Sequence, residues 1–183
     1  MKYLSKDEVA EVLKIAYRKS TRDHLMLLFS FNHALRRSEI ANLRIQDVQE
    51  GLIRVDRVKH SLHTEQPLIS SPNAIFDETK ALAAWLRERT GDGDVLFPSR
   101  KGNGKLSGTQ VARIAVYYME LAGVREELAH HHSLKHASCA HMIRSGAGLE
   151  LVKQFAGHKS ISSTIHYVHT SDEEAMAAFQ RSL

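Results

Sequence analysis

The chain has 183 residues, of which 43% are hydrophobic and 25% charged, a composition typical of a soluble globular domain. Its single cysteine, Cys139, excludes an internal disulfide and a cysteine-rich zinc module, and no apolar run approaches the roughly 20 residues of a membrane span. The net charge of +4 is compatible with a polyanionic partner, but so mild an excess is common in proteins without one.

The amino-terminal segment predicts two helices. Residues 1–8 become polar before an apolar segment could form, so they do not resemble a secretory signal, and we expect a cytoplasmic protein. Ser5 and Glu8 form a capping-box pattern, and the apolar residues that follow have helical spacing, which predicts a helix from Ser5 to Lys19. The apolar stretch from Leu25 to Leu35 is too continuous for a surface helix and predicts a buried one.

A short β-ribbon is predicted next. In residues 52–58, Ile53 and Val55 alternate with Arg54 and Asp56, as they would in a strand with one buried face. Residues 67–69 are the predicted partner strand, with Lys59 at the turn between the two strands.

Helices are predicted through the remainder of the chain. Four of them are each followed by a glycine, a frequent helix terminator. They span residues 73–90, 107–122, 133–145 and 149–156, before Gly91, Gly123, Gly146 and Gly157. A last short helix is predicted from Ser171, with Ala175, Met176, Ala178 and Phe179 on its apolar face. The sequence therefore predicts one mainly α-helical domain, residues 1–183, with a small antiparallel sheet.

Several short motifs carry side chains suited to phosphate chemistry. Residues 34–44 place Arg36 three positions before Glu39, which opens a predicted helix. Residues 132–136 read His-Ser-Leu-Lys-His, and a Gly157-His158 pair follows them. Tyr167 comes nine residues after His158.

In this order the motifs resemble those of the tyrosine recombinases. The resemblance covers nearly the whole chain: the arginine box, a β-ribbon lysine eight residues before a proline, the histidine box, the glycine-histidine pair and the tyrosine. It implies the catalytic-domain fold of that family and these catalytic residues: Arg36, Lys59, His132, Lys135, His158 and Tyr167. Two positions depart from the family pattern, since Lys135 stands where arginine is usual and Ala34 where glycine is common.

The resemblance also implies the reaction, site-specific recombination of DNA through a covalent 3′-phosphotyrosine at Tyr167. Attack on a phosphodiester develops negative charge on the nonbridging oxygens, which Arg36, Lys135 and His158 would stabilise. His132 would act as the base, and Lys59 would protonate the departing 5′ oxygen. Because the covalent link keeps the bond energy, no metal or nucleotide cofactor is implied.

The expected partners are double-stranded DNA, further copies of the chain in a tetramer, and accessory DNA-bending proteins. The expected outcome is integration, excision or inversion of a DNA segment, as in mobile elements. Most family members carry an amino-terminal helical domain that closes around DNA. We expect this chain to be a catalytic domain alone, either excised or resembling the short fimbrial-switch invertases.

Two other functions remain open from the sequence. Because Lys135 stands where arginine is expected, the alternative is a recombinase-fold DNA-binding protein that has lost strand cleavage and serves in regulation or architecture. The histidines at 130, 131, 132, 136 and 141 suggest a metal site, although no cysteine or well-placed carboxylate completes it. Taken singly, Arg36 could pair with Glu39, Lys59 could be a solvated turn lysine, and Tyr167 could be a core tyrosine.

Overall fold

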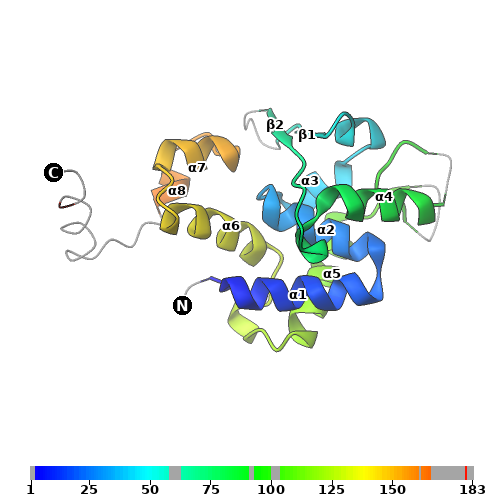
Figure 1. Ribbon diagram of the computed structural model, residues 1–183, viewed down its shortest axis with the longest axis horizontal. Helices are drawn as coiled ribbons and strands as arrows, with labels where there is room; N and C mark the ends of the chain where they lie inside the picture. Colours follow the sequence, from blue (N-terminus) through cyan, green and yellow to red (C-terminus); the bar gives the residue numbers. More distant parts are fainter. Residues whose placement is uncertain are drawn as a thin grey trace.

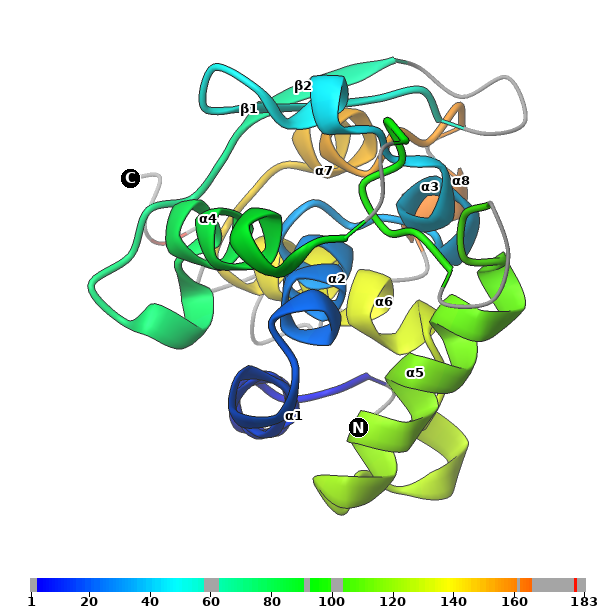
Figure 2. The same cartoon turned by 90° about the vertical axis from the view of Figure 1, so that its right-hand side faces the viewer.

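The computed structural model describes residues 3–57, 63–90, 93–99, 104–160, 162–165 and 180. In this part of the chain, helices surround a buried central helix, and a two-stranded sheet lies across one side of them (Figures 1 and 2). The predicted fold class, mainly α-helical with a small antiparallel sheet, is confirmed. None of the described helices is long and apolar enough to cross a lipid bilayer.

The two predicted amino-terminal helices are present. Helix α1 spans Lys6–Lys19 behind the capping box, in which Glu8 N donates to Ser5 Oγ (3.2 Å) and Ser5 N donates to Glu8 Oε2 (2.7 Å). Helix α2 spans Thr21–Asn32 and is buried at every position from Asp23 to Ser30. It packs against α1, α4 and α6, so it forms the centre of the main hydrophobic core.

Of the other helices that were predicted within the described residues, all but one match the observed boundaries to within about two residues. Residues 73–90 form two elements because Asp77 begins a new helix, its carboxylate accepting a hydrogen bond from the backbone N–H of Lys80. The remaining helical elements are α3 (Arg37–Asn42), η1 (Ile45–Val48), η2 (Ala74–Phe76), α4 (Glu78–Glu88), α5 (Gly108–Leu121), η3 (Glu126–Leu128), α6 (His132–Arg144), α7 (Leu149–Phe155) and α8 (Ser162–Ile165).

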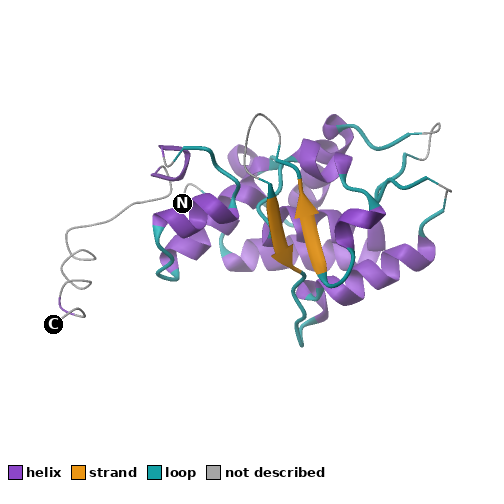
Figure 3. Cartoon of the chain, turned by 90° about the horizontal axis from the view of Figure 1, so that it is seen from above, coloured by secondary structure: helices purple, strands orange, loops and turns teal. Residues whose placement is uncertain are grey.

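The sheet pairs β1 (Leu52–Val55) with β2 (Thr64–Pro67) in antiparallel fashion (Figure 3). Leu52 lies opposite Pro67 and Val55 opposite Thr64, so the partner strand predicted at residues 67–69 was placed about three residues too late. The physical reason is that the inward positions of β2, Thr64 and Gln66, are polar. Hydrophobic alternation therefore could not reveal this strand.

Some sequence expectations lie outside the described residues. These are the ribbon turn with Lys59, Tyr167, and the helix expected from Ser171, of which only Gln180 is described. Cys139 is buried in a small second cluster with Ala34, Val152 and Ala156. That cluster joins α6 and α7 to the turn before α3, and the candidate site lies around it.

Candidate active site

The arginine box folds as a self-capped helix start. Glu39 is 2% exposed, and its carboxylate accepts hydrogen bonds from the backbone N–H of Arg36 and from its guanidinium Nη1, both at 2.8 Å. The plain pairing of Arg36 with Glu39 is therefore present, and it also fixes the guanidinium, whose side chain stays 26% exposed. Ala34 has a φ of 49°, a left-handed conformation that costs a non-glycine residue roughly 1–2 kcal/mol.

Lys135 connects two of the predicted site segments. It lies on α6, is 4% exposed, and donates from Nζ to the carbonyl oxygens of Ala34 (2.7 Å) and Ala156 (2.8 Å). Those carbonyls precede Arg36 and His158 by two residues each. An ammonium carries three hydrogens, so these two contacts leave one for a ligand.

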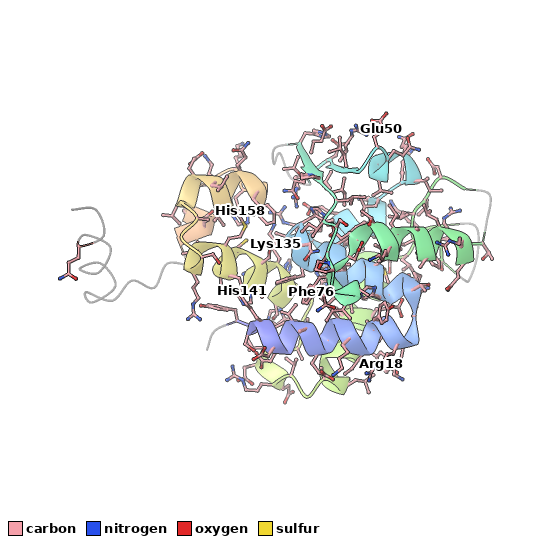
Figure 4. The ribbon with its side chains drawn as sticks, viewed as in Figure 1. Arg18, Glu50, Phe76, Lys135, His141 and His158 are labelled. Carbon is pink, nitrogen blue, oxygen red and sulfur yellow. The ribbon has the colours of Figure 1, made fainter. Side chains whose placement is uncertain are left out.

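His158 lies three residues after the end of α7, beside Lys135 (Figure 4). It is 5% exposed, and its Nδ1 hydrogen-bonds with Oγ1 of Thr164 in α8 at 3.0 Å. Burial, followed by the charges of Lys135 and Arg36, lowers the pKa of His158 to about 4. The imidazole is therefore neutral at physiological pH unless an anion binds close by.

His132 begins α6 and is exposed, whereas Lys135 one turn later is buried. Burial of part of its ring and the charges of His130, Arg37, Lys135 and Arg36 lower the pKa of His132. A neutral imidazole can accept a proton, as a base must. The structure thus brings Arg36, His132, Lys135 and His158 into one electrostatic environment, while Lys59 and Tyr167 lie outside the described residues.

Arg57 is a member of this cluster that the sequence analysis missed. It is 6% exposed and forms an ion pair with Glu39. The acceptors of its guanidinium are Thr64 Oγ1 (2.9 Å), Ala34 O (3.3 Å), Glu39 Oε2 (3.2 Å), His33 O (3.1 Å) and Phe155 O (3.1 Å). A signal was available, because Arg57 continues the inward alternation of Ile53 and Val55, where a charged residue is unusual.

The cluster carries more positive than negative charge. Burial, with Arg57 and Arg36 adding to the effect, lowers the pKa of Lys135 to about 7. Burial by itself raises the pKa of Glu39, but the Arg36 N–H and the Arg57 guanidinium bring it below its ordinary value. One carboxylate thus faces three cationic side chains, so the site is suited to an additional anion such as a phosphate.

Two of the histidines that suggested a metal site have structural partners. Nε2 of His131 hydrogen-bonds with Ser30 Oγ (3.0 Å), and burial lowers the pKa of His131 to about 3. Nε2 of His141 donates to the carbonyl of Leu4 (2.9 Å). Among the described residues, no three His, Cys, Asp or Glu side chains are grouped to hold a metal ion.

Comparison with known proteins identifies the family. Residues 2–174 match the model of the phage integrase family. The chain is 30% identical to the type 1 fimbriae regulatory protein FimE of Escherichia coli K12, over 98% of this chain and 91% of FimE. It is also 30% identical to the tyrosine recombinase XerA of Pyrococcus furiosus, of which it spans 61%.

Solved structures share the fold. A crystal structure of XerA recombinase matches 98% of this chain and 64% of its own, with a TM-score of 0.79 and 24% identity. The XerH site-specific recombinase bound to its difH substrate matches 97% of this chain and 53% of its own, with a TM-score of 0.80 and 22% identity. With the family model covering nearly every residue, the chain belongs to the phage integrase family of tyrosine recombinases.

Proposed function

We propose that the protein recombines double-stranded DNA at specific sites through a covalent 3′-phosphotyrosine intermediate on Tyr167. The observation that carries the proposal is the cluster in which Arg36, Arg57 and Lys135 face a single carboxylate, Glu39, so that positive charge is in excess next to His158. Two similar proteins support this proposal. XerA and XerH are both named recombinases, and XerH is bound to its difH DNA substrate.

The proposed roles follow from the chemistry of the side chains. Arg36 engages two nonbridging oxygens through its planar fork, so it is the main phosphate-positioning group. Lys135 contributes its third hydrogen and His158 its imidazole. Arg36, Lys135 and His158 together form the phosphate cradle. Outside this cradle, His132 accepts the proton of Tyr167, and Lys59 protonates the departing 5′ oxygen. None of these roles requires a metal ion.

Trapping on nicked DNA tests the proposal. A duplex carrying its recombination site, with a nick next to the scissile phosphate, loses a short strand after cleavage and so retains the covalent adduct. We expect the wild-type protein to become covalently attached to such DNA, with the same yield in the presence of a metal chelator. Binding without attachment on every duplex offered, including DNA that flanks its own coding sequence, would instead support a DNA-binding protein that has lost cleavage.

Lys135→Arg is expected to raise the single-turnover cleavage rate by about ten- to a hundredfold. This is the rate gain expected when arginine adds one charge-assisted hydrogen bond to the phosphate in the transition state. Lys135→Ala should lower the rate further, with little change in DNA affinity. The larger guanidinium must enter a packed site, so the arginine variant should also lose about 1–3 kcal/mol of stability. An unchanged rate, beside a wild type that cleaves as fast as its relatives, would show that lysine is fully competent here.

Lys135→Arg should also change how the cleavage rate depends on pH. Lys135 has a pKa of about 7 in the folded protein and so loses its charge as the pH rises through that value, whereas arginine keeps its charge. The ratio of the Lys135→Arg rate to the wild-type rate should therefore increase from about pH 6 to about pH 8. A constant ratio would mean that Lys135 does not titrate in the reacting complex.

We infer further that the protein acts as a tetramer on DNA, assisted by DNA-bending proteins, with residues 171–183 contacting a neighbouring copy. An apolar cleft of about 730 Å³ between α1 and α6, lined in part by Phe31, Met142 and Phe155, is a suitable acceptor for the tail residues Met176 and Phe179. Burying two such side chains is worth about 1.5–3 kcal/mol each.

Deleting residues 171–183 should therefore weaken assembly on two-site DNA by at least about tenfold while leaving single-site binding nearly unchanged. Sizing the complexes on one-site and two-site duplexes measures both quantities. Equal losses on the two duplexes would argue against a tail that contacts a neighbouring copy.

A further inference from the structure

Arg57 has no hydrogen left for a DNA phosphate. A guanidinium carries five N–H hydrogens, and Arg57 has five acceptors around it at 2.9–3.3 Å. Its side chain is fully buried, whereas that of Arg36 is 26% exposed. Arg57 is therefore suited to hold protein segments together, and Arg36 is suited to bind a ligand.

The acceptors of Arg57 belong to the segments that carry the phosphate cradle. The carbonyls of His33 and Ala34 lie in the turn before Arg36, and Phe155 O ends α7 three residues before His158. Thr64 adds the second strand of the ribbon. One planar group thus spans the ribbon, the arginine turn and the end of α7.

The turn at Gly157 is shaped around the same side chain. Gly157 has a φ of 63°, and a Cβ atom at this position would lie 2.7 Å from Cγ of Arg57. Because Gly157 and the side chain of Arg57 are both buried, neither could move to make room for such a Cβ atom without disturbing its neighbours. The backbone next to His158 is therefore in direct contact with Arg57.

Lys135 cannot perform this bridging by itself. It donates to Ala34 O and Ala156 O, and an ammonium lacks the fixed, planar geometry that joins five acceptors. We propose that Arg57 is the positioning residue that sets the spacing of Arg36 and His158 in the cradle. This inference rests on the proposed function.

Arg57→Lys is the principal test, because it keeps the charge and supplies at most three hydrogens. Arg54→Lys is its matched control. Arg54 lies three residues earlier, on β1, is partly exposed, and pairs with Glu50 and Glu65 at the surface. Covalent attachment to nicked DNA under single-turnover conditions, DNA affinity and thermal unfolding are measured for both variants.

Substrate chemistry separates a positioning role from a loss of folding. In the reaction Tyr167 Oη forms a bond to phosphorus, the bond to O5′ breaks, and O5′ leaves with that electron pair and takes up a proton. Replacing one nonbridging oxygen by a methyl group removes the negative charge that Arg36 and His158 must meet. A variant with misplaced cations should therefore lose less rate on this methylphosphonate than on ordinary DNA.

We expect Arg57→Lys to slow attachment by about ten- to a hundredfold on ordinary DNA and by no more than about threefold on the methylphosphonate, with DNA affinity little changed. Arg54→Lys should match the wild type on both. Equal losses on the two substrates overturn the inference and leave Arg57 a purely structural residue.

A third substrate, with sulfur in place of O5′, removes the need for a proton donor, because a thiolate leaves without one. If Arg57→Lys recovers the wild-type rate on this DNA, Arg57 serves the acid Lys59 and not the cradle, which also overturns the inference. Persistence of the defect supports it. Failure of the wild type to attach to any of the three substrates contradicts the proposed function, and the inference with it.

A milder pair of variants covers the case in which Arg57→Lys does not fold. Thr64→Val keeps the shape of the side chain and removes the acceptor of Arg57 Nε, whereas Thr64→Ser keeps the hydroxyl. We expect the valine variant to slow attachment on ordinary DNA by about three- to tenfold relative to the serine variant, and less on the methylphosphonate. Equal rates for the two variants would overturn the inference.

Discussion

Glu39→Gln is expected to destabilise the protein by about 3–5 kcal/mol, because it leaves the guanidinium of Arg57 buried without its counter-charge. The two side chains are fully buried and 3.2 Å apart, and Glu39 also accepts two hydrogen bonds from Arg36. Chemical denaturation at neutral pH measures the loss. Glu65→Gln is the control, since Glu65 pairs with Arg54 at the surface and its replacement should have little effect.

The effect of Glu39→Gln should depend on pH with a definite sign. The pKa of Glu39 is lowered in the folded protein, so its carboxylate contributes stability above its ordinary value of 4.5. That contribution is lost as the pH falls below 4.5 and through the lowered folded-state pKa. The stability difference between wild type and variant should therefore narrow in acid, and a difference that stays constant would show that Glu39 does not titrate in this range.

The elements that the sequence predicted well are those whose signals are local. Ser5 and Glu8 cap α1 within four residues of sequence, and the continuous apolar run of α2 can only be buried. β2 was misplaced because its inward residues, Thr64 and Gln66, are polar. Thr64 accepts a hydrogen bond from Arg57, on the other side of the ribbon turn, and Gln66 donates one to Phe155 O, far along the chain. Polar residues that make such hydrogen bonds leave no periodic apolar pattern.

The candidate site was only partly predictable for a similar reason. The motifs and the family resemblance predicted Arg36, Lys135 and His158 as site residues, and the structure places these three residues close together. Their dependence on Arg57 was not visible, because its five acceptors come from four separate stretches of the chain. Lys59 and Tyr167 remain predictions, as does the assignment of residues 1–183 to a catalytic domain alone.

Tyr167→Phe is expected to abolish covalent attachment, by at least about a thousandfold, while leaving DNA affinity unchanged. In the proposed reaction the phenol supplies the attacking oxygen and phenylalanine has none, whereas the residues proposed to bind the phosphate are unchanged. The other tyrosines provide the alternatives. Tyr118 is a poor candidate, because burial and the neighbouring Asp23, which accepts its hydroxyl hydrogen, raise its pKa. Tyr117 is exposed on α5 and is the more serious rival.

Peptide mapping of the adduct trapped on nicked DNA tests the central claim most directly. Protein is digested after trapping, and the peptide that carries the nucleotide is identified by mass. We expect the nucleotide to be found on Tyr167 in the wild type and the Tyr167→Phe variant to yield no adduct. An adduct on Tyr3, Tyr17, Tyr117 or Tyr118, or any adduct formed by the Phe variant, would contradict this assignment.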